Sequence, residues 1–177
     1  MFLVLYVVLT IAIIFVLLAL IAPRSYSVSR SIDIEKPLTE VFAYLKLIKN
    51  QDNWSPWKKK DPEMKQKFIG TDGEVGFISK WEGNKAVGIG EQEIKKVENN
   101  YKIETELRFF KPWKSLSNAF LMVDAIDDNN TKVTWGFSGS NPAPTNIFML
   151  FFNFEKAVGK DFEEGLSDLK AILENEY

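Results

Sequence analysis

The chain contains no cysteine and no histidine. These two side chains supply most metal ligands, activated nucleophiles and near-neutral proton shuttles in proteins, so we expect no metal site, no cofactor and no thiol or imidazole catalysis. Carboxylate-only hydrolysis, a lysine Schiff base and a serine–lysine pair remain compatible with the composition. The absences therefore favour a binding protein over an enzyme.

The chain also lacks a strong excess of one charge. Its 22 Lys and Arg residues and 24 Asp and Glu residues leave a net charge of −2, which provides no positive field for phosphates, and we expect no nucleic-acid partner. Aromatic residues are abundant, at 14% of the chain. In a domain of this size they either fill a solid core or line a cavity for a ligand.

One long apolar run occupies residues 2–22, in which Tyr6 and Thr10 are the only polar side chains. As a helix it would span roughly 31 Å, which matches the hydrocarbon thickness of a bilayer. We expect a transmembrane anchor over residues 1–22 and one soluble domain over residues 23–177. A cleaved signal peptide is the alternative, but it would carry a basic segment before a shorter apolar core. Arg24 and Arg30 follow the run, so the positive-inside rule predicts a single-pass protein with a cytoplasmic soluble domain.

The remaining sequence alternates between strand-like and helix-like patterns. Period-two alternation predicts a strand over 26–34, and helical spacing after Pro37 predicts a helix, followed by a short aromatic helix or turn over 53–57. Further strands are predicted near 75–81, 87–97, 101–109, 116–126 and 133–137. Steps of three and four predict one long amphipathic helix from Thr145 to Glu174, in which Gly159 and Gly165 would allow a close approach to the sheet. The fold class is α+β, with a curved antiparallel sheet around a long C-terminal helix.

Several short motifs occur along the chain in a fixed order. They are Ile34-Glu35-Lys36-Pro37, Asn53-Trp54-Ser55-Pro56-Trp57, Trp81-Glu82-Gly83-Asn84, Lys111-Pro112-Trp113, Val133-Thr134-Trp135 and the segment 159–166. This order resembles the SRPBCC (START-like) superfamily, and more closely its polyketide cyclase/dehydrase-like branch. The resemblance implies a helix-grip fold with a hydrophobic cavity between sheet and last helix, which in such proteins often binds lipids, steroids or polyketide-like molecules. It transfers no catalytic residue to this chain.

The candidate ligand-binding residues share the apolar side of their predicted elements. They are Trp54, Trp57, Phe77, Trp81, Leu107, Phe109, Asn118, Phe120, Trp135, Phe137, Phe154, Val158 and Phe162. From the sequence alone, each is either core or cavity wall. Trp54 and Trp57 would form either a lid over the cavity mouth or a hydrophobic plug that pins the short helices to the sheet, and Asn118 would orient a ligand if it points inward.

Three further features carry alternatives. Glu91 and Glu93 point to one side of their predicted strand, and Gln92 points to the other. A carboxylate on the inner side would be buried, and burial would raise its pKa. The run Lys58-Lys59-Lys60 either faces anionic lipid or lies in a solvated loop. Residues 147–152 are apolar throughout, so we expect them to be covered by other helices, a ligand, the membrane surface or another protein.

These patterns support two functional hypotheses. The first is a membrane-anchored protein that binds a hydrophobic small molecule or lipid in an internal cavity. The second is an accessory subunit of a larger membrane complex, with a filled cavity and no ligand turnover. A weaker third hypothesis is a cyclase or hydrolase that uses Glu91, Glu93 or Asp124 as its acids.

Overall fold

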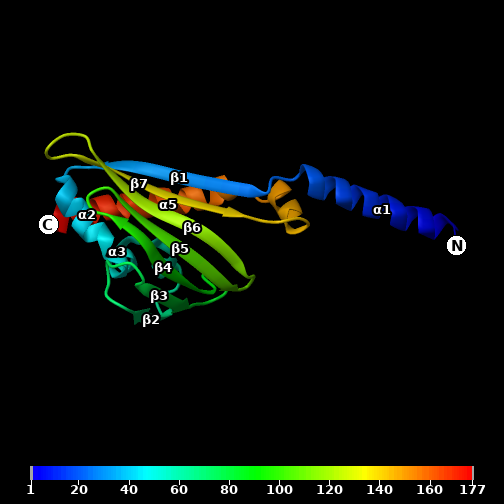
Figure 1. The fold of residues 1–177 in the computed structure, drawn as a ribbon, viewed down its shortest axis with the longest axis horizontal. Helices are drawn as coiled ribbons and strands as arrows, with labels where there is room; N and C mark the ends of the chain where they lie inside the picture. The colour runs from blue at the N-terminus through cyan, green and yellow to red at the C-terminus, as the bar shows by residue number, and fades with distance from the viewer. Residues whose placement is uncertain (1, 177) are drawn as a thin grey trace.

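A computed structural model describes residues 2–176 of the chain. Its first element is the helix α1 (Phe2–Ile21), which projects from the rest of the molecule (Figure 1). Among residues 2–176, α1 alone is long and apolar enough to cross a membrane by length and composition, with a mean hydropathy of 3.2. Almost all of its surface is exposed, so it is not the core helix of the domain.

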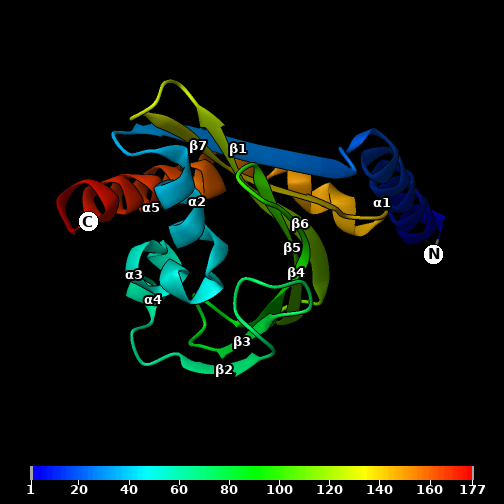
Figure 2. The same ribbon diagram turned by 60° about the vertical axis from the view of Figure 1, so that its left-hand side comes forward.

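Seven antiparallel strands form one curved sheet in the order β1-β7-β6-β5-β4-β3-β2 (Figures 1 and 2). The strands are β1 (Ser25–Ile34), β2 (Lys65–Ile69), β3 (Ile78–Glu82), β4 (Ile89–Glu98), β5 (Lys102–Lys111), β6 (Ser115–Ala125) and β7 (Thr131–Ser140). Six of them correspond to predicted strands. No strand is predicted at the position of β2. Its alternating lysines are typical of a solvated basic segment, and its edge position leaves most of the strand exposed.

The helices lie on the concave side of this sheet (Figure 2). They are α2 (Leu38–Lys46), the short η1 (Ile48–Asn50), α3 (Gln51–Trp54) and α4 (Pro56–Lys60), and the long α5 (Phe154–Glu176). Four side chains of α2 are buried, and α5 packs along β1 at the edge of the sheet. An apolar core between the helices and the sheet joins residues of α2, α5 and the central strands. This arrangement confirms the predicted α+β architecture.

The last helix begins later than predicted. Thr145–Leu150 form a separate 3-10 helix, η2, and α5 begins at Phe154. The Asn153 carboxamide oxygen accepts a hydrogen bond from the backbone N–H of Lys156, 2.9 Å away, which is the geometry of a helix N-cap. The single helix expected from Thr145 is therefore wrong. Asn153 is the sequence signal that would have divided it, because asparagine favours N-cap positions.

Two glycines of α5 allow it to lie close to other elements, as predicted. A Cβ atom added to Gly159 would lie 2.3 Å from a guanidinium nitrogen of Arg30 in β1. One added to Gly165 would lie 2.9 Å from the Trp135 ring and 3.0 Å from Pro56. At Gly165 a side chain would force the helix away from its neighbours, whereas at Gly159 the flexible end of Arg30 could move aside.

Candidate functional site

The concave face of the sheet is defined by the cross-strand register. In β7 and β6 the inward residues have odd numbers, and Ala119 lies opposite both Phe137 and Thr105. On the next strands toward the β2 edge, the paired inward residues are Leu107 of β5, Gln92 of β4 and Ser79 of β3. Most of these inward positions are buried or partly exposed, whereas several outward neighbours are exposed.

Toward the end of the sheet nearest α1, the concave face carries apolar side chains that stay partly exposed. We call this set the aromatic wall; its members are Trp81, Leu107, Phe109, Phe137 and, from α5, Phe154. The rings of Trp81 and Phe109 meet edge to face at 5.8 Å. Tyr26 connects the other two rings, because it stacks on Phe154 at 4.6 Å and contacts Phe137 at 5.5 Å. All five are candidate ligand-binding residues of the sequence, and the four that belong to strands lie on the concave face at this end of the sheet.

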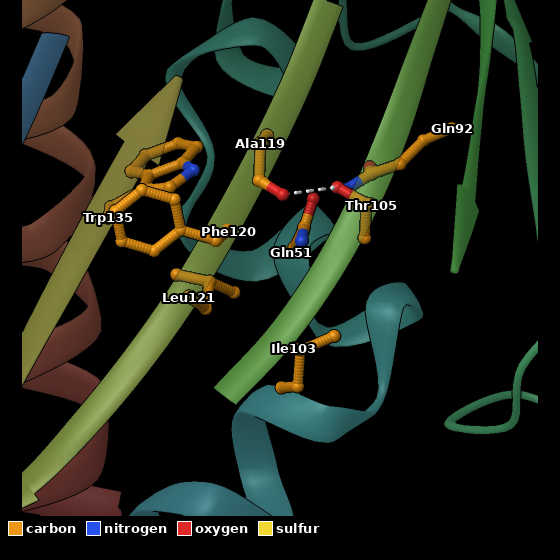
Figure 3. Close-up of a pocket in the computed structure, with 8 residues that line it drawn as sticks. All are labelled: Gln51, Gln92, Ile103, Thr105, Ala119, Phe120, Leu121 and Trp135. Carbon is orange, nitrogen blue, oxygen red and sulfur yellow. Dashed lines mark hydrogen bonds between the residues drawn. The ribbon is translucent and has the colours of Figure 1, made fainter. Parts of the chain in front are cut away.

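The middle of the concave face encloses only a small void. Its volume is about 10 Å³, close to the space that one water molecule needs and far below the roughly 300–1,000 Å³ of a typical ligand pocket. Gln51 reaches toward it from α3, and its side chain ends between Ala119 and Thr105 (Figure 3). The remaining lining residues are Gln92, Ile103, Phe120, Leu121 and Trp135. The void borders the aromatic wall, because Gln92 pairs across the strands with Leu107.

Beyond the void, aromatic side chains fill the space between sheet and helices. Trp135 stacks on Phe162 of α5 at 4.1 Å, and Trp54 and Trp57 meet Trp135 edge to face at 4.9 and 5.5 Å. Trp54 is buried and Trp57 is partly exposed. Trp54 and Trp57 therefore form a plug that holds the short helices against the sheet, and they do not form a lid. Phe77 is also buried, and Val158 packs at the edge of this core.

Two predicted cavity residues point away from the concave face. Asn118 is exposed and pairs with Ser138 and Glu106 on the outer side of the sheet. A Cβ added to Gly136 would lie 2.1 Å from the ring of Phe120, which places this ring on the outer face although the residue contributes to the void lining. The inward orientation expected for both is therefore wrong. The alternation of apolar and polar residues predicts the wrong inner face for β6, because the small residues Ser117 and Ala119 face inward while Leu116 and Phe120 lie outside.

Few polar groups accompany the aromatic wall. The hydroxyls of Tyr26 and Ser117 share a hydrogen bond of 3.0 Å, and the Gln92 amide donates to Thr105 Oγ1 at 3.2 Å. The indole Nε1–H of Trp81 is buried and finds no acceptor within residues 2–176. Buried donors are nearly always paired, so a water or the polar atom of a ligand would complete this site. An apolar surface with a few polar groups is typical of hydrophobic ligand sites.

The carboxylates considered as catalytic acids lie on the outer face. Arg108 donates to Glu91 and to Glu93, both at 2.6 Å, and also contacts Glu106, while Lys80 lies 2.9 Å from Glu91. The hydrogen bonds from Lys80 and Arg108 hold the pKa of Glu91 below its ordinary value, although burial opposes this effect. Hydrogen bonds from Arg108 and from a neighbouring lysine lower the pKa of Glu93 in the same way.

A raised pKa, the condition for a general acid at either position, is therefore absent from this cluster. Asp124, the third candidate acid, is exposed on the outer face opposite Lys132. The catalytic hypothesis thus has no carboxylate on the concave face among its own candidates.

The same cluster predicts a pH-dependent stability effect. We expect Arg108→Gln to reduce the free energy of unfolding at pH 7 by about 1–2 kcal/mol, because the carboxylates of Glu91 and Glu93 lose their shared donor. Their lowered pKa values mean that the wild-type contribution is complete above their ordinary pKa and is lost as the pH falls through the lower folded value. The difference between variant and wild type should therefore shrink below about pH 4.

Urea unfolding between neutral and acidic pH measures this difference. Lys96→Gln is the control, because its ion pair with Glu98 is exposed to solvent and should contribute little to stability. A difference for Arg108→Gln that stays constant across the pH range would contradict the assignment.

The basic run of α4 is paired with α5. Lys59 contacts Asp168, and Lys60 lies 2.7 Å from Asp161. Lys58 donates to Gln66 of β2 at 3.4 Å. These contacts hold α4 against α5 and β2 and pair the three lysines within the domain. For residues 2–176, there is also no group of three or more acidic side chains arranged to hold a metal ion.

Comparisons with known proteins reveal likeness of structure without likeness of sequence. No family model matches the chain, and no curated protein matches it. A solved structure of a protein from Nitrosospira multiformis has a TM-score of 0.61 at 18% identity, and the match covers 85% of this chain and 98% of that one. CalU16 from Micromonospora echinospora has a TM-score of 0.57 at 15% identity, covering 86% and 78%. The Aha1 dimer from Colwellia psychrerythraea has a TM-score of 0.57 at 18% identity, covering 85% and 97%.

These similarities, with the curved sheet and the long terminal helix described above, assign the domain a helix-grip fold. At such identities they concern the fold alone. The finer resemblance to the polyketide cyclase-like branch stays a prediction.

Proposed function

We propose that the protein is anchored in a membrane by α1 and binds a hydrophobic small molecule or lipid on the concave face of its sheet. The observation that carries this proposal is the aromatic wall. Its side chains are apolar, face inward and stay partly exposed, although a folded domain ordinarily buries such residues together.

The small void limits how a ligand is held. At about 10 Å³ it accommodates neither an acyl chain nor a ring. A ligand therefore lies along the aromatic wall, at the partly exposed end of the concave face, and extends deeper only if α3 with Gln51 moves outward. The anchor complements this site, because α1 places the domain beside a source of hydrophobic molecules.

A matched pair of substitutions tests the wall. We expect Leu107→Gln to lower the amount of lipid that co-purifies with the full chain, measured by native mass spectrometry from detergent, at least several-fold. The reason is that a polar amide on the wall loses its hydration when an apolar ligand covers it. Ile126→Gln introduces the same polar amide at an exposed position at the opposite end of the sheet, and should leave bound lipid unchanged.

Equal lipid content in wild type and both variants would contradict a site on the wall. Absence of any co-purifying lipid or added lipophilic probe from wild-type protein would contradict ligand binding itself.

One observation favours a second candidate function, that of an accessory subunit in a membrane complex. The core beyond the void is filled by stacked aromatic rings, which is the condition expected of a domain that holds no ligand. Crosslinking in native membranes followed by affinity purification separates the two proposals. Discrete crosslinked products with larger membrane proteins, together with lipid-free protein, would favour the subunit, whereas an uncrosslinked chain with bound lipid would favour the carrier.

A further inference from the structure

Apolar side chains are exposed in the connection between β7 and α5. Phe148, Leu150, Phe151 and Phe152 all expose a large part of their surface, and Phe151 is 78% exposed. Within the described part of the chain nothing covers these four side chains, although an apolar run of this kind is expected to be covered. Exposed apolar side chains that are contiguous in this way mark a surface that meets a partner or a membrane.

The position of this connection relative to α1 is fixed by Asn146. This asparagine is fully buried, and its Nδ2 atom donates hydrogen bonds to the backbone oxygens of Ala19 at 2.8 Å and Ala22 at 3.0 Å. Carbonyl groups in the last turn of a helix have no partner within the helix, so Asn146 satisfies the end of α1. The 3-10 helix η2 is thereby held beside the C-terminal end of α1 (Figure 1).

A second exposed apolar group lies at the same end of the sheet. The turn between β5 and β6 exposes Trp113 at 77%, together with Phe110 and Leu116, and it carries the exposed Lys111 and Lys114. The views in Figures 1 and 2 place this hairpin end on the side of the domain from which α1 projects. Tryptophan and lysine are the residues that favour the boundary between lipid and water, because each combines an apolar body with a polar tip.

We propose that these two groups form a second contact with the bilayer. This interfacial patch comprises Phe148, Leu150, Phe151 and Phe152 with Phe110, Trp113 and Leu116, and it inserts into the headgroup region around the anchor. The proposal rests on the proposed function in one respect, namely that α1 spans the membrane. A predominantly apolar helix of 20 residues that ends at Ile21 places its last turn at the bilayer surface, and Asn146 holds η2 at that level. Lys111 and Lys114 complement anionic headgroups.

The patch also connects the bilayer to the aromatic wall through a series of ring contacts. Phe148 stacks on Phe152 at 5.4 Å, Phe152 meets Phe154 at 4.8 Å, and Phe154 stacks on Tyr26 at 4.6 Å. Phe154 is a member of the wall. A hydrophobic molecule therefore has an apolar surface to follow from the membrane interface to the concave face, without crossing water.

The absence of cysteine makes a direct test simple, since one introduced cysteine is a unique labelling site. Spin labels are placed on the full chain at Phe151→Cys and Trp113→Cys, and the protein is reconstituted into phosphatidylcholine vesicles with a minority of phosphatidylglycerol. Collision with apolar oxygen and with a water-soluble nickel chelate is measured by power saturation. Ile126→Cys is the control at the opposite end of the sheet, because Ile126 is also exposed, at 53%. Ile11→Cys reports on the middle of α1.

We expect the ratio of oxygen to chelate accessibility at positions 151 and 113 to exceed that at position 126 several-fold. If both behave like position 126 while position 11 is lipid-exposed, the interfacial patch is overturned and the anchor stands. A chelate-accessible label at position 11 overturns the anchor and the patch with it. Exclusion of both reagents from positions 151 and 113 indicates protein contact, and would also overturn the lipid assignment.

Discussion

Replacing Trp135 by alanine should destabilise the domain by about 3–5 kcal/mol, the range for removing a buried tryptophan from a core. Trp135 is 6% exposed, and its indole contacts Phe162, Trp54 and Trp57 at ring distances between 4.1 and 5.5 Å. The substitution removes all three contacts and opens a cavity beside the existing void. Urea unfolding of the full chain in detergent micelles, followed by circular dichroism, measures the loss.

Trp113→Ala provides the matched control for this measurement. Trp113 is 77% exposed, so its removal should change the free energy of unfolding by less than about 0.5 kcal/mol. Near-equal effects of the two substitutions would show that the stacked rings are not the core of the domain.

The second large effect is expected for Gly165→Val, at about 2–3 kcal/mol of destabilisation. A Cβ at this position already lies 2.9 Å from the Trp135 ring and 3.0 Å from Pro56, and the two methyl groups of valine would push α5 away from the sheet. The better helix propensity of valine relative to glycine offsets only a few tenths of a kcal/mol. Thermal unfolding of the full chain is the measurement.

The combination of the two substitutions gives an internal check. In the Trp135→Ala background the valine methyl groups would enter the space that the indole vacates, so the double variant should be less destabilised than the sum of the single variants. Ala157→Val is the control for valine in the helix, because Ala157 lies in α5 but is exposed. Strict additivity in the double variant would contradict direct packing of Gly165 on Trp135.

The sequence predicts the fold well where one side of a helix or strand is buried and the other side is exposed to solvent. The strands β1, β4, β5 and β7 follow from their period-two alternation, and the close approach of α5 follows from Gly159 and Gly165. The pattern fails at β6, where small residues face inward and Phe120 covers Gly136 outside. It also fails at β2, an exposed edge strand, because the absence of a buried face removes the signal.

The candidate site is less predictable than the fold, because a wall residue and a core residue obey the same pattern. Phe137 and Trp135 lie two residues apart on the same face of β7, yet the first is partly exposed and the second is buried under the tryptophans of α3 and α4. Only the path of the short helices distinguishes them. Asn146 could not have been identified from its neighbours, since its role depends on carbonyl groups more than 120 residues away in the chain.

The short link between α1 and the sheet limits what the domain can reach. Only Ala22, Pro23 and Arg24 separate Ile21 from the first residue of β1, which corresponds to about 10 Å of fully extended chain, and Asn146 further restrains this junction. If α1 spans a membrane as proposed, a domain held in this manner cannot swing out to deliver a ligand to a distant acceptor membrane. It would work as a stationary dock, to which molecules and partners arrive by diffusing laterally within the same leaflet.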